Sequence, residues 1–496
     1  MNSMWRKVKS LLLTNRGIRQ TVLKNTFWLF AGNVGSKLLR AALIIYAARI
    51  LGTSEYGIFS YVVSLAGFFS LFSDIGLSPL LTRESVKNKE RAREYIATTL
   101  FIKLGILIAT VLFTVLVAPT FVTLPQARNL IPIAAILLAF DSIRAFGFAI
   151  VRAQNRMQIE ATYIILTDIF ITGISIPAIS LVPASATLAM TYTIGSGIGS
   201  LLLFWKLRKY FKNIISSFNK RLIGYILGSA WPFAVIALLG AFMLNIDTII
   251  LGWFRSAHEI GLYGAAQRPV QLLYVFPSLF TASLFPIISK LVQAQATPKL
   301  KKVLETAITA MMGFAIPVAI GGILLGKQII ALLFGPAYLP ATPTFQLLLV
   351  TILAVIPGGI VNNSIFAYNR QRVFIVSTIA GALTNVVLDL LLIPPYGIAG
   401  SAVATIISQF IVVSYNWMQL KRINPFHILP HIPKIVTASL AMALFTSALA
   451  SLHIHILINI PISIAFYLGT LFLLKERLLL SEGKAVLALI FSKGQG

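Results

Sequence analysis

The sequence predicts an all-α polytopic membrane protein with about fourteen transmembrane helices. Of its 496 residues 57% are hydrophobic and 11% are charged, and the mean hydropathy is +0.88. Soluble domains carry roughly 25% charged residues, so an ordinary water-soluble protein is excluded. Long apolar stretches recur from residue 27 to residue 474, separated by polar intervals too short for a folded soluble domain.

Each expected span contains close to the roughly 20 apolar residues that a helix needs to cross the hydrocarbon core. An even number of spans places both termini on the same side of the membrane. The expected spans are residues 26–48, 57–80, 96–118, 130–151, 161–182, 186–205, 227–252, 260–289, 304–325, 342–367, 373–393, 397–418, 433–451 and 455–474.

The lysines and arginines orient the chain. With the N-terminus in the cytoplasm, 32 of the 41 lie in cytoplasmic segments, four lie in the opposite loops and five lie within spans. Basic residues accumulate in cytoplasmic loops because they are hard to translocate. We therefore expect a multi-pass protein of the plasma (inner) membrane with both termini cytoplasmic. The same rule explains the net charge of +27 without a nucleic-acid partner.

The first 25 residues are expected to form an amphipathic helix on the cytoplasmic surface. Cations flank the short apolar run 11–13, which is too short for a cleaved signal peptide. The chain contains no cysteine, which excludes disulfides and thiolate metal sites. His427 and His431 have helical spacing, but Pro430 separates them and no carboxylate is near, so no metal site is expected.

Two pairs of similar short segments suggest an internal repeat. The sequence Ile-Leu-Gly at 50–52 precedes Glu-Tyr-Gly-Ile-Phe, and the same triplet at 250–252 precedes Glu-Ile-Gly-Leu-Tyr. Leu-Val-Pro at 181–183 resembles Leu-Ile-Pro at 392–394. These similarities predict two six-helix lobes related by a pseudo-two-fold axis along the membrane normal. The alternative is chance recurrence in an apolar chain. The predicted parts are residues 1–25, an N-lobe at 26–221, a C-lobe at 222–420, and two further helices with a cytoplasmic tail at 421–496.

Several of these segments resemble a known family. Phe-Trp-Leu-Phe-Ala-Gly-Asn begins at residue 27, Ala-Ala-Arg-Ile-Leu-Gly-Thr-Ser-Glu-Tyr-Gly begins at residue 47, and Asp-Ile-Gly-Leu at residue 74 is followed by Thr-Arg-Glu at residue 82. Together they are similar to the opening of polysaccharide-transporter flippases. These O-antigen and exopolysaccharide flippases are a branch of the multidrug/oligosaccharidyl-lipid/polysaccharide exporter superfamily. Residues 247–252, 261–266 and 391–402 resemble the second-lobe pattern of the same family.

The resemblance covers the first twelve spans. It implies a V-shaped, multidrug-exporter-like transporter that flips polyprenyl-(pyro)phosphate-linked oligosaccharide from the cytoplasmic to the outer leaflet by alternating access, for surface polysaccharide synthesis. The family has no catalytic signature, so we expect no enzymatic activity and no cofactor. The expected partners are the lipid-linked substrate, membrane lipids, and a polysaccharide polymerase or glycosyltransferases. The expected transport unit is a monomer.

Ionisable side chains inside spans are costly, so each is a functional candidate. Lys37 and Arg40 lie three residues apart on one helical face, with Asn33 one turn earlier. Because the planar guanidinium can bond two phosphate oxygens, we assign this pair to the pyrophosphate. Arg268 is the corresponding candidate in the eighth span. Arg144 is a fourth, although Asp141 on the same face makes a structural ion pair an alternative.

Other intramembrane polar residues have two interpretations. Lys103 either lines the cavity or extends its stem to the headgroups. Four acids are expected nearer the ends of spans than their centres, where each pairs across the lobes, caps a helix or binds a coupling Na⁺ or H⁺; these are Asp74, Asp168, Asp247 and Asp389. The chain carries no ATP-binding motif, so an ion gradient, the membrane potential or consumption of the product must supply the energy.

The sequence leaves two alternative functions. A Na⁺- or H⁺-coupled drug or metabolite exporter of the same superfamily would bind organic cations through intramembrane acids. The predicted spans carry five cations, and a cationic interior favours an anionic substrate. A membrane-embedded glycosyltransferase or polymerase needs acid–base residues in an extramembrane loop, and the expected outer loops are short.

Overall fold

The computed structural model describes residues 18–428 and 430–474, and within these ranges the chain is helical and contains no strand. Most of the expected N-terminal amphipathic helix and the cytoplasmic tail lie outside the described residues. The chain forms two compact units, Met1–Gly261 and Leu262–Gly496. The lobe boundary expected between residues 221 and 222 stays a prediction.

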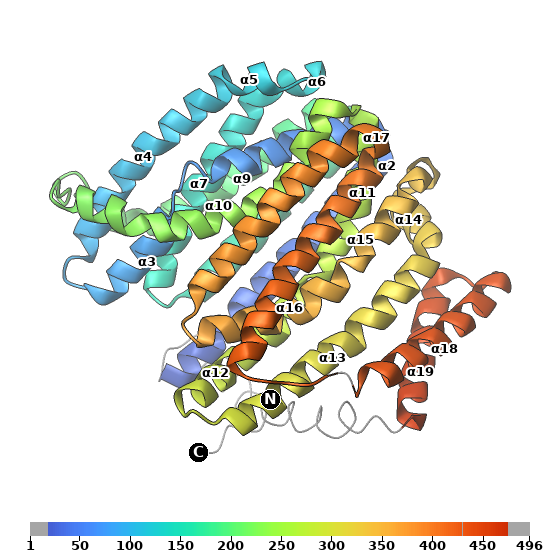
Figure 1. Ribbon diagram of the computed structural model, residues 1–496. Coiled ribbons are helices and arrows are strands. Elements are labelled where there is room, and N and C mark those ends of the chain that lie inside the picture. The colour runs from blue at the N-terminus through green and yellow to red at the C-terminus, as the bar shows by residue number, and fades with distance from the viewer. Residues whose placement is uncertain (1–17, 429, 475–496) are drawn as a thin grey trace, which may run out of the picture. The chain divides into compact units, whose positions relative to one another are not determined.

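Unit 1 consists of long helices joined by short turns. Its elements are α2 (Ile18–Ser70), α3 (Leu77–Lys87), α4 (Ala92–Leu116), α5 (Ala118–Phe121), α6 (Pro125–Arg128), α7 (Ile131–Ala153), α8 (Met157–Leu181), α9 (Ser185–Leu207), η1 (Arg208–Phe211), α10 (Leu222–Phe254) and the first residues of α11 (Ala257–Leu273) (Figure 1).

Unit 2 contains the remainder of the chain. After the rest of α11 it comprises α12 (Val275–Gln293), α13 (Thr297–Leu324), α14 (Gly326–Phe334), η2 (Pro336–Ala341), α15 (Thr342–Val350), α16 (Ile352–Ala367), α17 (Gln371–Ile423), α18 (Ile432–Ser451) and α19 (Ile456–Leu473).

The expected polytopic all-α fold is confirmed. Ten helices within the described ranges are long and apolar enough to cross a membrane, and two shorter apolar helices cover residues 242–254 and 284–293. α2 and α17 each contain two of the expected spans, which meet at a kink where the backbone of Gly52 and of Gly397 is not helical. Both glycines have positive φ, 72° and 60°, which other residues adopt only with strain.

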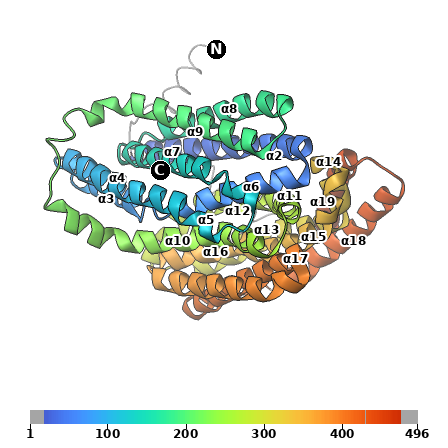
Figure 2. The ribbon, with the colours of Figure 1, turned by 90° about the horizontal axis from the view of Figure 1, so that it is seen from above.

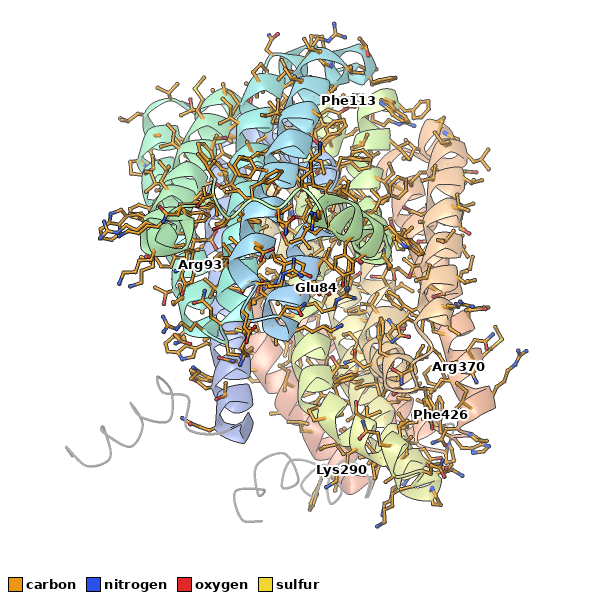
Figure 3. All side chains as sticks on the ribbon, turned by 90° about the vertical axis from the view of Figure 1, so that its left-hand side faces the viewer. Glu84, Arg93, Phe113, Lys290, Arg370 and Phe426 are labelled. Carbon is orange, nitrogen blue, oxygen red and sulfur yellow. The ribbon has the colours of Figure 1, made fainter. Side chains whose placement is uncertain are left out.

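Within unit 1, α8 packs along α2 and α9, and α7 packs against α9 and α3 (Figure 2). Small residues permit these close approaches, as is usual between membrane helices. A Cβ atom on Gly195 of α9 would lie 2.6 Å from the backbone of Ile171 of α8. The two ends of α4 are marked by Arg93 and Phe113 in Figure 3. α10 lies against α2 and α3.

A tight helix crossing lies where the second arm of α2 meets the start of α11. A Cβ atom on Gly57 would lie 1.8 Å from the carbonyl oxygen of Ala257, and one on Gly261 would lie 1.9 Å from the carbonyl oxygen of Thr53. The hydroxyl of Thr53 is also 2.7 Å from Nδ1 of His258. Only glycine fits at these two positions, because in each case the obstacle is backbone.

In unit 2, α16 packs against α12, α13 and α17, and the hairpin of α18 and α19 packs against α13 (Figure 1). The rings of Phe445 and Phe466 stack across this hairpin with centroids 4.2 Å apart. The hydroxyl of Tyr467 donates to the carbonyl of Gly313 at 2.7 Å and fastens α19 to α13.

Candidate functional site

The centre of unit 1 contains an ion pair between two distant parts of the sequence. Nε of Arg40 on α2 donates to Oδ1 of Asp168 on α8 at 2.8 Å. The Asp168 side chain is fully buried, whereas that of Arg40 is 39% exposed. The second Asp168 oxygen, Oδ2, is buried and has no partner among the described residues. Among the residues that the structure describes, none forms a hydrogen bond with the two terminal amino groups of Arg40.

The position of Asp168 corrects a prediction. It lies 11 residues after the start of α8 and 13 before its end, and is therefore central rather than near a terminus. α8 begins at Met157, four residues before the expected span, because the charge of buried Glu160 is neutralised. Arg152 donates to both oxygens of Glu160, at 2.8 and 2.5 Å.

A second ion pair lies on α7. Nη2 of Arg144 donates to Oδ1 of Asp141 at 2.5 Å, and Nη1 donates to Oγ of Ser196 at 2.7 Å. Ser196 in turn donates to the same Asp141 oxygen at 2.8 Å. The three side chains form a closed triangle in which Arg144 is almost buried. The ion pair considered for Arg144 is present.

Tyr192 of α9 lies beside the first pair. The guanidinium carbon of Arg40 lies 5.9 Å from the centre of its ring. We call this set the charge cluster of unit 1; it comprises Arg40, Asp141, Arg144, Asp168, Tyr192 and Ser196. Its two cations and two anions balance.

Lys37 adds an uncompensated charge next to this cluster. It lies one turn before Arg40 on α2, is exposed, and has no hydrogen bond or ion pair among the described residues. Asn33, one further turn away, is exposed and donates to the carbonyl of Leu29 in its own helix at 2.7 Å. The α2 face therefore presents one free ammonium and one half-exposed guanidinium.

Lys103 does not extend toward the headgroups, which overturns one of its two interpretations. Its side chain is only 2% exposed, and its ammonium donates to Oδ1 of Asp74 in the turn before α3. The same carboxylate accepts from the hydroxyl of Ser78 at 2.6 Å. The nearby carboxylate supplies the countercharge within the protein. The pair ties α4 to the start of α3.

The remaining candidates lie apart from the cluster in the sequence. Arg268 on α11 belongs to unit 2 and donates from Nη1 to Oε1 of Gln271 at 3.4 Å. Its Nε is buried without a hydrogen-bond partner in the described ranges. Asp247 on α10 and Asp389 on α17 are both buried, in unit 1 and unit 2 respectively.

Sequence reasoning missed Tyr192 and Ser196. Both lie on α9 with Ser200 at intervals of four residues, so they share one helical face. Ser200 donates to the carbonyl of Phe140 at 3.0 Å and continues the polar contacts with α7. The regular spacing of these polar residues on one face of the span was a usable signal. Among residues 18–428 and 430–474 no group of three or more His, Asp or Glu side chains could hold a metal ion.

Comparison with known proteins identifies related sequences. Residues 22–292, more than half of the chain, match the family model described as polysaccharide biosynthesis protein, and residues 232–391 match the MatE model. The probable flippase AglR of Haloferax volcanii is 27% identical over 77% of this chain and 79% of its own length. The probable low-salt glycan biosynthesis flippase Agl15 of the same organism is 22% identical over 78% and 80%. The putative O-antigen transporter of Shigella flexneri is 22% identical over 77% and 94%.

Solved structures show the same fold. The lipid II flippase MurJ in an inward closed conformation is similar with a TM-score of 0.71 and 20% identity, over 91% of this chain and 99% of that chain. An inward-facing multidrug-resistance transporter of the MATE family has a TM-score of 0.65 and 15% identity, over 78% and 95%.

Proposed function

The chain belongs to the polysaccharide biosynthesis protein family, and from this premise we propose that it flips a polyprenyl-diphosphate-linked oligosaccharide across the plasma membrane. The relatives named as flippases and as an O-antigen transporter support this substrate class. The proposed direction is from the cytoplasmic to the outer leaflet, by alternating access and without a catalytic step. The distribution of lysine and arginine supports cytoplasmic termini.

The geometry of Arg40 carries the proposal. Asp168 holds the guanidinium at Nε, which leaves the two terminal amino groups available on a half-exposed side chain. Such a fork matches the oxygens of a phosphate and can form two parallel charge-assisted hydrogen bonds. Since Asp168 already orients the fork, less conformational entropy is lost when the anion binds.

The charge balance suits a transporter rather than a tight binder. The cluster is neutral, and Lys37 contributes one excess positive charge beside it. A diphosphate is attracted by this excess, and the two aspartates limit the affinity. Transport requires a site that is favourable enough for entry and weak enough for release.

A drug or metabolite exporter is disfavoured by the same contacts. Asp141 and Asp168 are each paired with an arginine, so neither offers an uncompensated negative charge to an organic cation. Uptake of a cationic dye such as ethidium, driven by an ion gradient and without movement of lipid-linked sugar, would replace the flippase proposal with this one.

The first test is substitution of the free ammonium. Lys37→Gln is expected to lower translocation of fluorescent lipid-linked oligosaccharide in proteoliposomes by about 5-fold, because one exposed ion pair contributes about 1 kcal/mol. The control is Lys87→Gln at the end of α3, where the side chain is also exposed and should not affect transport. Full transport in the Lys37 variant would remove this residue from the site.

We further propose the membrane potential as the energy source. An inside-negative potential drives each negative charge outward and releases about 2.3 kcal/mol per 100 mV as it crosses. Translocation of the diphosphate lipid should therefore accelerate with a potassium diffusion potential in valinomycin-treated vesicles and reverse its preference when the potential is inverted. A rate that follows a pH or sodium gradient at zero potential would contradict this part of the proposal.

A further inference from the structure

The segment that joins α9 to α10 in unit 1 is strongly basic. It covers residues 205–221, from the last turn of α9 through η1 to the start of α10, and we call it the basic linker. It contains no Asp or Glu, and its six cations are all exposed; they are Lys206, Arg208, Lys209, Lys212, Lys220 and Arg221. None of the six forms an ion pair or a side-chain hydrogen bond with a residue that the structure describes. The basic linker therefore presents six uncompensated positive charges.

Contacts with α4 and α7 hold the basic linker in place. The hydroxyl of Tyr210 donates to Oε1 of Gln154 at the end of α7 at 2.7 Å. Nδ2 of Asn219 donates to Oε2 of Glu94 near the start of α4 at 2.7 Å, and its backbone N–H donates to the hydroxyl of Thr98 at 3.1 Å. In Figure 2 the linker is the green stretch that passes α4 on its way to α10. Because the chain is already ordered, a ligand that binds these cations costs less conformational entropy.

The basic linker reaches the depth of the hydrocarbon along α4. With 25 residues α4 is about 37 Å long, which exceeds the hydrocarbon core of about 30 Å by about 7 Å. Phe101 lies about 14 Å along α4 from its first residue, so it is inside the hydrocarbon when α4 spans the whole core. The ring of Phe218 packs edge-on against Phe101, with centroids 5.2 Å apart. The linker therefore lies at the border between hydrocarbon and headgroups.

Exposed apolar side chains lie between the cations of the basic linker. Trp205, Ile215 and Phe218 are 64%, 78% and 40% exposed. Aromatic side chains are favoured at the membrane interface, where one part of the ring meets hydrocarbon and the other meets headgroups. The guanidinium carbon of Arg208 lies 5.2 Å from the centre of the Trp205 ring, so a cation accompanies this ring. Apolar side chains interleaved with lysine and arginine are typical of segments that lie on a membrane surface.

We propose that the basic linker binds the headgroup phosphates of acidic phospholipids in the leaflet that it borders. Each lysine or arginine near the membrane surface attracts anionic lipids, and these six have no countercharge among the described residues. The exposed apolar side chains hold the cations at the depth of the phosphates. A soluble acidic protein would match the charges, but it would leave Ile215 and Phe218 facing the hydrocarbon without using them.

A fluorophore on the basic linker tests the proposal. The chain contains no cysteine, so Ser216→Cys at an exposed position provides a single attachment site. The labelled full-length protein is reconstituted in vesicles of phosphatidylglycerol and phosphatidylcholine, in which one of the two lipids carries bromine on its acyl chains. Both brominated lipids should quench the fluorophore. At equal mole fractions phosphatidylglycerol should be enriched at the fluorophore by about 10-fold, which corresponds to 1.4 kcal/mol. If neither lipid quenches, the linker lies in water, a soluble acidic partner fits it better and the proposal is overturned.

Removal of half of the charge tests the role of the cations. The triple variant Lys209→Gln, Lys212→Gln and Lys220→Gln keeps three of the six cations, and none of the replaced side chains has a partner within the described ranges. Half of the electrostatic free energy leaves a preference for phosphatidylglycerol of about 3-fold. Quenching by brominated phosphatidylcholine should persist, because the apolar side chains are unchanged. An unaltered 10-fold preference in this variant would overturn the proposal.

The matched control removes three exposed cations of unit 2 while the fluorophore stays at residue 216. Its substitutions are Lys299→Gln, Arg370→Gln and Arg372→Gln, at side chains without an ion pair in the described part of the chain. The net charge changes by the same amount as in the linker variant, but the preference at residue 216 should be kept. Equal losses in the two triple variants would assign the attraction to the charge of the whole protein and overturn the proposal.

Ionic strength separates the two kinds of contact. At about 1 M salt the Debye length falls to about 3 Å, so the preference for phosphatidylglycerol should disappear. Quenching by the brominated chains should remain, because salt does not screen apolar contacts. A preference that survives high salt would contradict the assignment to headgroup phosphates. None of these measurements depends on transport, so they are independent of the proposed function.

Discussion

Replacing Arg40 with alanine is expected to reduce translocation of lipid-linked oligosaccharide by at least about 100-fold, because two charge-assisted hydrogen bonds of about 1.5–3 kcal/mol each are lost. Arg40→Lys keeps the charge but lacks the planar fork, so its translocation rate should lie between those of Arg40→Ala and the unmodified protein. The measurement is the initial rate in proteoliposomes, normalised to the amount of inserted protein.

The Arg40→Ala variant also leaves Asp168 buried without its cation. Removing one member of a buried pair costs about 3–5 kcal/mol and would reduce folding as well as transport. The double variant Arg40→Gln with Asp168→Asn separates the two effects, since an amide pair of similar shape replaces the ion pair. We expect it to insert normally and to remain inactive. Full transport by the double variant would show that Arg40 has only a structural role.

The second large effect is expected on stability. Asp74→Asn should lower the free energy of unfolding by about 3–5 kcal/mol, because Lys103 is buried and loses its countercharge. Asparagine can still accept the hydrogen bond from Ser78, so the substitution isolates the ion pair. Thermal unfolding in detergent, followed by far-ultraviolet circular dichroism, measures the shift.

Two controls define what the Asp74 result means. Glu94→Gln removes the partner of Arg91 in an exposed pair of 3.0 Å and should cost less than about 1 kcal/mol. Asp74→Asn combined with Lys103→Met should recover most of the stability, because no buried charge remains. If the double variant folds but no longer transports, the pair takes part in transport rather than only in folding.

The helical type of the elements followed from the sequence, because hydrocarbon imposes a length on each apolar stretch. The ends of the helices were predicted less accurately. α8 begins earlier than the hydropathy of the sequence predicts, because Arg152 pairs with the buried Glu160 and neutralises its charge. The backbone of Gly52 and of Gly397 is not helical, so α2 and α17 each consist of two helices that meet at a kink.

The site was predictable only where its partners are neighbours in sequence. Asp141 and Arg144 are three residues apart on one helix, so their spacing alone indicated the pair. Arg40 and Asp168 are separated by 128 residues, and no feature of either span specifies that α2 lies beside α8. Hydropathy identifies which charges lie within the membrane, whereas helix packing decides which of them meet.

The crossing of α2 and α11 has the form of a homodimer interface folded into one chain. Gly57 meets residue 257 and Gly261 meets residue 53, so the contact is isologous: each copy of the Glu-x-Gly segment offers the other the same surface. Equivalent substitutions at the two glycines should therefore be equally harmful. Any movement that parts the segments must break both halves of the contact together, which makes this joint all-or-none rather than gradually deformable.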